Sequence, residues 1–145
     1  MPDQTTEHIT VINSEKLKIH KEPPLPLAVL TLSGYTKSET YKKGINLLLE
    51  QTKKDNISHW LINCAKGCSI SSEDHWWTSN EIMPAVSEEL DLRKIAIIES
   101  KNIFNRLSLM ALFDNLDSEA QVEIQFFELE RNARNWLLEN SDLDF

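Results

Sequence analysis

Two cysteines and two histidines near the middle of the chain are the residues best suited to metal or thiol chemistry: Cys64, Cys68, His59 and His75. Zinc sites favour tighter cysteine pairs with two further ligands. His59 and Cys64 lie five residues apart on an expected strand, so their side chains point to opposite faces. We therefore predict no metal site. Cys64 is expected to be a small buried hydrophobic residue. For Cys68 a functional thiol is the alternative, because the pKa of a thiol falls at a helix N-terminus.

Catalytic motifs are not visible in the sequence. No histidine has a serine or aspartate at a spacing that indicates a triad, although triads assemble only in space. The histidines are His8, His20, His59 and His75. A glycine-rich loop that could bind a phosphate is also absent. The glycines are Gly34, Gly44 and Gly67. We predict that the protein is not an enzyme and has no catalytic residues and no cofactor.

The charge and the apolar runs argue against several partners and locations. The 145 residues include 23 acidic and 15 basic ones, for a formal net charge of −8. Nucleic acids and anionic membranes both attract clusters of Lys and Arg, so neither is an expected partner. The longest apolar runs, such as Leu27–Leu32, are far below the roughly 20 residues of a transmembrane helix. Residues 1–7 lack the features of a signal peptide. We expect a cytoplasmic protein with free thiols.

Short apolar runs alternate with amphipathic stretches along most of the chain. Strands are expected at 8–13, 17–19, 27–32, 57–64, 94–99 and 122–127. Strands that alternate with helices are typical of βαβ units on a largely parallel sheet. We predict one α/β domain, residues 1–145, with a mixed sheet of five or six strands and about four helices. The first two strands should form an edge hairpin, and 122–127 should be an edge strand. Residues 1–7 and 141–145 are expected to fray.

Several local signals place the helices. Thr36 and Glu39 fit a capping box, and Ser71 and Ser72 are good N-caps. Pro84 should start a turn or kink its helix. The helix after the strand 94–99 is expected to turn one apolar face inward, made of Ile103, Leu107, Met110 and Ala111.

The four tryptophans divide into two groups. Trp60 and Trp136 lie on apolar faces and are expected in the core. Trp76 and Trp77 are adjacent on a helix, about 100° apart, so they should not be equally buried. One of them is expected to border a groove or a subunit contact, where Trp is favoured. The alternative is that both pack under neighbouring loops.

Four stretches carry a family resemblance: 60–64, 70–77 with Pro84 further along, 93–100, and 126–137, where a strand leads into a helix with a late Trp-Leu pair. Together with the order of elements, they make the chain similar to the small SpoIIAA-like (STAS/SEC14-like) bacterial proteins. The resemblance implies the STAS-like fold and a non-catalytic module.

In the anti-sigma factor antagonists of this fold, a partner kinase phosphorylates a serine at the start of the helix after the central strand. The resemblance makes Ser71 and Ser72 the candidate phosphosites. The chain departs from that pattern, because Asn63 stands where an acidic residue is usual, and Glu73 and Asp74 replace small or apolar residues. The alternative is that Ser71 or Ser72 only caps a helix.

The expected function is a protein-interaction or regulatory module. Its partner would be another protein or a second copy of the chain. A homodimer would form through an edge strand or through the helices that flank the region 76–90. The alternative is a domain that binds a small apolar molecule or a lipid in a pocket of the helix layer.

Overall fold

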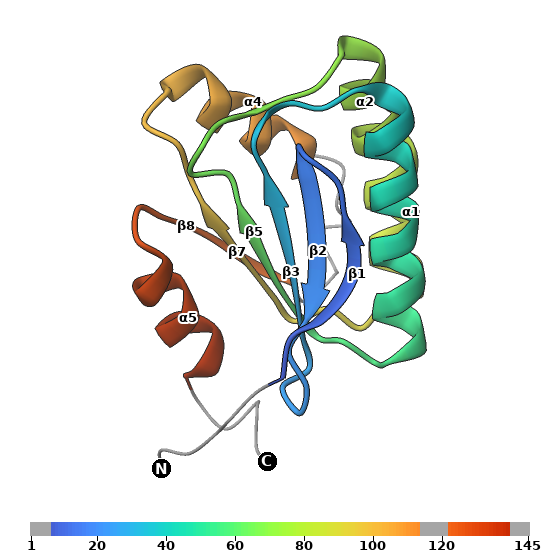
Figure 1. The fold of residues 1–145 in the computed structure, drawn as a ribbon, viewed down its shortest axis with the longest axis vertical. Coiled ribbons are helices and arrows are strands. Elements are labelled where there is room, and N and C mark those ends of the chain that lie inside the picture. The colour runs from blue at the N-terminus through green and yellow to red at the C-terminus, as the bar shows by residue number, and fades with distance from the viewer. Residues whose placement is uncertain (1–6, 114–121, 140–145) are drawn as a thin grey trace.

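A six-stranded sheet lies at the centre of the computed structural model, which describes residues 7–113 and 122–139 (Figure 1). The strand order is β1-β2-β3-β5-β7-β8. The first two pairings are antiparallel and the other three are parallel. The strands are β1 (Ile9–Asn13), β2 (Leu17–Lys21), β3 (Leu27–Leu32), β5 (His59–Asn63), β7 (Lys94–Ile98) and β8 (Glu123–Phe127). The predicted mixed α/β sheet, edge hairpin and edge position of the last strand are confirmed. Of the ends expected to fray, 1–6 and 141–145 lie outside the described residues, whereas the amide of Glu7 donates to the Pro23 carbonyl at 2.9 Å.

The outer strand β1 does not pair evenly with β2. Thr10 pairs with His20, but Ile12 pairs with Ile19, so Val11 is one residue more than the partner strand can match. An extra residue of this kind is a β-bulge, which bends and twists the strand that contains it.

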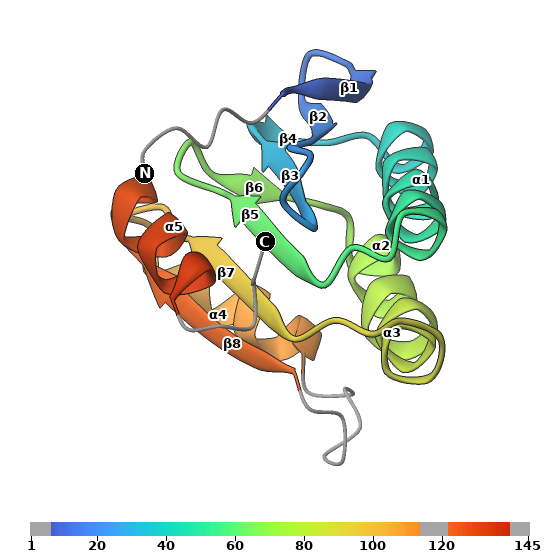
Figure 2. The ribbon, with the colours of Figure 1, turned by 90° about the horizontal axis from the view of Figure 1, so that it is seen from below.

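Helices cover both faces of the sheet (Figure 2). One face is covered by α1 (Ser38–Lys54), α4 (Ile103–Leu112) and a helical segment made of α2 (Ser72–Trp77), the π-helical η1 (Thr78–Ile82) and α3 (Met83–Glu89). The other face is covered by α5 (Glu130–Leu138). The central strands β3, β5 and β7 are therefore buried on both sides, as their almost continuous apolar sequences indicate.

Two polar contacts accompany the apolar packing of the core tryptophans. Trp60 packs under α1, and its Nε1 donates to Thr52 Oγ1 at 2.9 Å. Trp136 belongs to α5 and packs against the sheet, and Lys94 Nζ lies 4.7 Å from the centre of its ring. Lys94 is buried, and its Nζ donates to the carbonyl of Trp136 at 2.8 Å. Both tryptophans are core residues, as predicted.

A second, two-stranded sheet was not expected. It joins β4 (Gly34–Tyr35) to β6 (Cys68–Ser69) in parallel. The amide of Thr36 donates to the carbonyl of Ser69 at 3.0 Å and extends this ladder. The capping box predicted for Thr36 and Glu39 is wrong for this reason: Thr36 is still in the ladder, and α1 begins after Lys37, which makes no side-chain cap.

The segment α2–η1–α3 remains helical across Pro84. The amide of Met83 donates to the carbonyl of Thr78, five residues earlier, which is the π-helical pattern. Pro84 follows at once, in the first turn of α3, where its missing amide removes no required bond. Of the two outcomes predicted at Pro84, a turn or a kink, the turn does not form, because the wider π turn accommodates the ring.

Helix α1 lies close against β2 at Gly44. A Cβ built on Gly44 would lie 2.5 Å from Cδ2 and 2.8 Å from Cδ1 of Leu17, which is fully buried in β2. The absence of a side chain at this position lets α1 lie against the hairpin.

We predict that Gly44→Ala destabilises the protein, although alanine is the better helix former by about 1 kcal/mol. Overpacking against Leu17 costs about 1–3 kcal/mol, so urea denaturation should show a net loss. The double variant Gly44→Ala/Leu17→Ala is the matched control, and it should lose less than the sum of the two single losses. Strict additivity would show that the two residues do not clash.

Candidate functional site

Trp76 and Trp77 differ in their surroundings. Trp76 is 59% exposed. Trp77 is half-buried, with its ring edge-on to Tyr41 at 6.1 Å between centroids and with Lys42 Nζ 5.5 Å above it. Trp76 is therefore the ring of this pair that is open to a partner, while Trp77 helps to hold α2 against α1.

Helix α4 faces the opposite way from the sequence prediction. Ile103, Leu107 and Met110 are exposed and Ala111 is half-buried, whereas Leu109 and Leu112 are buried. The prediction was wrong because this helix is apolar on more than one side, so periodicity alone does not select the buried face. The cap at Asn102, whose Oδ1 accepts from the amide of Phe104 at 2.9 Å, fixes where the helix begins.

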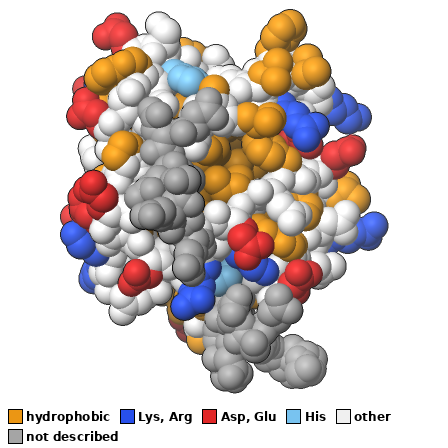
Figure 3. Space-filling view, turned by 180° about the vertical axis from the view of Figure 1, so that it is seen from behind, with side chains coloured by type: hydrophobic (Ala, Val, Ile, Leu, Met, Phe, Trp, Pro, Cys, Tyr) orange, Lys and Arg blue, Asp and Glu red, His pale blue; other side chains and the backbone are white. Residues whose placement is uncertain are grey.

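The result is an apolar outer surface, which we call the α4 face: Ile103, Phe104, Leu107 and Met110, with exposed fractions of 63, 75, 55 and 47%. Figure 3 shows hydrophobic side chains gathered on this side of the molecule. Helix α2 lies beside it, because Nε2 of His75 contacts the carbonyl of Ser108 at 3.0 Å. Contiguous exposed apolar side chains commonly mark an interaction site.

Two small cavities lie beneath α4. Their volumes are about 50 Å³ and 40 Å³, and both are lined by Leu32, Tyr41, Leu109 and Leu112. Pockets that hold drug-sized ligands measure about 300–1,000 Å³. The shared lining of the two cavities is mostly apolar. Their small volumes mean that neither can hold a lipid chain while α4 stays in place.

The two candidate phosphosites have different roles in the structure. Ser71 is the N-cap of α2, as predicted, and its Oγ accepts from the amide of Asp74 at 3.0 Å. Ser72 is exposed. Asp74 is fully buried, with one carboxylate oxygen accepting from Ser38 Oγ at 2.7 Å. Ser72 is therefore the more accessible hydroxyl, and Ser71 is the structural one.

Cys64 and Cys68 are both free thiols, and they interact with each other. Cys64 is buried, as predicted, and His59 is buried on the other face of the sheet, in contact with Ser58 Oγ at 2.7 Å. A hydrogen bond from the Cys64 thiol lowers the pKa of Cys68, although burial opposes this shift. The same contact, together with burial, raises the pKa of Cys64. Cys68 lies in β6, so the pKa of its thiol is lowered by Cys64 and not by a helix N-terminus, which was the alternative considered from the sequence.

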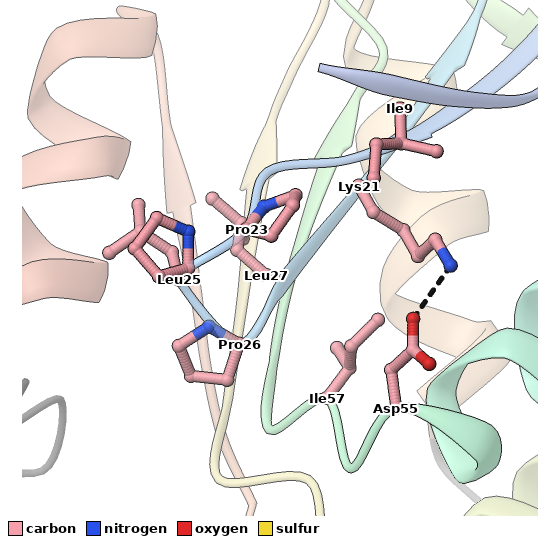
Figure 4. A pocket seen from close by; sticks show the side chains of 9 residues that line it. Ile9, Lys21, Pro23, Leu25, Pro26, Leu27, Asp55 and Ile57 are labelled. Atoms are coloured by element: carbon pink, nitrogen blue, oxygen red, sulfur yellow. Dashed lines mark hydrogen bonds and ion pairs between the residues drawn. The ribbon is translucent and has the colours of Figure 1, made fainter. Parts of the chain in front are cut away.

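A shallow pocket opens at the opposite end of the sheet. Its volume is about 360 Å³, and it is formed by the proline-rich turn 23–26 together with Ile9, Leu27 and Ile57. Lys21 and Asp55 at its rim are joined by an ion pair of 2.6 Å (Figure 4). Lys21 also donates to Gln51 at 2.7 Å. These charged groups bind each other, so the pocket offers a ligand mainly apolar and proline surface.

A buried carboxylate lies next to this turn, and the sequence analysis did not identify it. Glu22 is 1% exposed, and Arg134 of α5 donates to both its oxygens at 2.8 Å. Nε2 of His20 lies 2.7 Å from Oε2, and Nε2 of His8 lies 3.7 Å from it. Burial alone would raise the pKa of Glu22, but the hydrogen bonds from Arg134 and His20 hold it at about 2. No sequence signal links Glu22 to Arg134, because they are 112 residues apart.

The comparisons with known proteins bear on the fold. No family model and no curated protein matches the chain. Among solved structures, it is similar to an uncharacterised protein from the DUF3478 family, with a SpoIIAA-like fold, from Shewanella loihica PV-4. The TM-score is 0.56 at 18% identity, over 90% of this chain and 95% of that chain. The SpoIIAA-like fold implied by the sequence resemblance is thereby confirmed. Among the described residues, no helix is both long and apolar enough to cross a bilayer.

Arg134→Ala should lower the free energy of unfolding by about 3 kcal/mol, because it leaves the Glu22 carboxylate buried without its main partner. Glu130→Ala is the matched control: it removes the exposed ion pair that Arg134 makes at 2.7 Å, which contributes at most about 0.5 kcal/mol. Urea denaturation of both variants measures the difference. Equal losses in the free energy of unfolding would show that the buried ion pair contributes no more to stability than the exposed one.

The stability of the protein should also depend on pH through Glu22. The pKa of Glu22 is about 2 in the folded protein, against an ordinary value of 4.5. The ionised carboxylate therefore stabilises the folded state relative to the unfolded state. This stabilisation is complete above pH 4.5 and is lost as the pH falls towards 2. Denaturation curves across this range should show a steeper loss for the wild type than for Glu22→Gln. Parallel profiles would contradict the prediction.

Proposed function

We propose that the protein is a non-catalytic protein-interaction module whose recognition surface is the α4 face extended by Trp76. The observation that carries this proposal is the exposure of four apolar side chains on one helix, each close to half exposed or more. Covering such side chains with a partner gains about 25 cal/mol for each Å² of apolar surface removed from water.

The surroundings of the α4 face support a protein as the partner. Arg106 Nε lies 3.2 Å from Glu99 Oε1, so charges of both signs border the apolar residues, as in the polar rim of a protein interface. An anionic membrane would instead be met by clustered basic residues, and this chain has a net charge of −8. The acidic balance favours a partner whose own rim is basic.

The ionisable groups around the α4 face support binding in preference to catalysis. His75 is engaged with the carbonyl of Ser108, and Arg106 is paired with Glu99. Neither group is arranged to exchange a proton with a bound substrate. The free thiols of Cys64 and Cys68 support a cytoplasmic, reducing location for this activity.

Binding of an apolar ligand is the second candidate function. The observation in its favour is the apolar lining of the two cavities under α4. Since their volumes are only about 50 and 40 Å³, a lipid would have to displace Leu109 and Leu112 and lift the helix. This cost makes the outer surface of α4 the better supported site.

Regulation of the module by phosphorylation would act through Ser72. Its exposed hydroxyl is accessible to a kinase, whereas Ser71 Oγ is engaged in the cap. A phosphate adds about two negative charges on a helix that contacts α4 through His75. The neighbouring carboxylates of Glu73 and Asp74 would repel this phosphate and push it outward.

The experiment is position-specific photo-crosslinking in the cells that make the protein. A photoreactive phenylalanine analogue replaces Leu107 on the α4 face, or Lys43 on the exposed side of α1 as the matched control. We expect a protein adduct from position 107 and none from position 43. An adduct of twice the chain mass identifies a second copy as the partner.

Three further variants test the details. Phe104→Asp should abolish the adduct at position 107 without loss of stability, since Phe104 is 75% exposed. Ser72→Asp should reduce the adduct and Ser72→Ala should not, if a phosphate at this position regulates binding. A lipid adduct at position 107 would favour the second candidate, and no adduct of either kind would refute the proposal.

A further inference from the structure

Three potential metal ligands converge where β1 and β2 meet the turn before β3. The antiparallel register pairs Ile9 with Lys21 and Thr10 with His20, so it brings His8 opposite Glu22. His20 lies two residues before Glu22, on the same face of the sheet. The two imidazoles stack with their centres 4.4 Å apart and their planes 12° apart.

The distances within this cluster are close to those of a metal site. The ligand atoms of His8, His20 and Glu22 all lie within 4.8 Å of one another. Zinc bonds of 2.0–2.1 Å in a tetrahedral site place neighbouring ligand atoms about 3.3 Å apart. From Glu22 Oε2, the His20 nitrogen is at 2.7 Å and the His8 nitrogen at 3.7 Å. To reach this spacing, the first distance would lengthen and the second would shorten by about half an ångström each. The stacked rings would also have to turn so that both lone pairs point at one ion.

Arg134 sets the orientation of the carboxylate. Its guanidinium donates to both oxygens of Glu22 at 2.8 Å. A carboxylate oxygen can accept two hydrogen bonds. Oε2 accepts one from Arg134, and His20 Nε2 occupies its other position. A cation would take this second position once His20 turns its lone pair towards the same point. Partners of this kind orient and tune metal ligands. Arg134 also offsets the charge of Glu22, so most of the affinity must come from the imidazoles.

The cluster is open on one side. The side chain of His8 is 62% exposed and that of His20 is 23% exposed, while Glu22 forms the buried floor. A cation can therefore enter from solvent and keep a water molecule as its fourth ligand. Two imidazoles and one carboxylate favour Zn²⁺ or Cu²⁺ over Mg²⁺ and Ca²⁺, which prefer oxygen ligands.

We propose that His8, His20 and Glu22 form a surface site for a divalent transition-metal ion such as Zn²⁺ or Cu²⁺, with Arg134 as a positioning residue. The bound ion would cross-link the edge strand to the turn that Arg134 ties to α5. This site is independent of the α4 face.

Titration calorimetry with Zn²⁺ tests the site in the purified chain. The wild type should bind one ion with high affinity, and His8→Ala and His20→Ala should each weaken binding about tenfold or more. His75→Ala is the matched control, because it removes a histidine outside the cluster. Cys68→Ser controls for binding by the thiol pair. Both controls should retain the wild-type affinity.

A second measurement uses Cu²⁺ and the imidazole signals in NMR spectra. Substoichiometric Cu²⁺ should broaden the signals of His8 and His20 and leave those of His59 and His75 sharp. Since His8 is largely exposed, His8→Ala should keep the fold intact, and its circular dichroism spectrum checks this. A wild type that binds neither ion, or binding that His8→Ala and His20→Ala leave unchanged, would overturn the proposal.

Discussion

The structure depends on covering both faces of the parallel ladder formed by β3, β5 and β7. On one face, α1, the α2–α3 segment and α4 share this role, but on the other face α5 covers the ladder through Ala133, Trp136 and Leu137. Two buried charges attach this helix. Arg134, in the middle of α5, binds Glu22, and Lys94 donates to the carbonyl of Trp136 near the end of the helix. Charges in such surroundings add little net energy, but removing one partner is costly, so they fix the position of α5.

Helix α4 has a different relation to the sheet. Leu109 and Leu112 anchor it, yet its outer surface also carries four apolar side chains, those of the α4 face. A helix that only covered a core would direct polar side chains to water. This excess of apolar residues is the basis for proposing a second set of contacts, and it distinguishes α4 from α1 and α5, whose apolar residues face the core.

Much of the fold could be predicted from the sequence, because the strands are short apolar runs separated by amphipathic helices. The edge hairpin and the half-exposed strand at 123–127 also have clear local signatures. Three features have none. The buried face of α4 is ambiguous because Ile103, Leu107 and Met110 compete with Leu109 and Leu112. The β4–β6 pairing joins two segments of two residues each. The Glu22 cluster forms only when the hairpin and α5 come together in space.

The bulge at Val11 affects how molecules of this protein can meet. A bare outer strand offers its backbone amides and carbonyls to any neighbouring chain, and a flat one templates fibrous growth. At the β1 edge of the sheet, the extra residue breaks the regular spacing of the backbone amides and carbonyls. At the β8 edge, the strand carries the exposed polar side chains of Glu123 and Gln125. Continuous sheets across two molecules are therefore disfavoured at both margins.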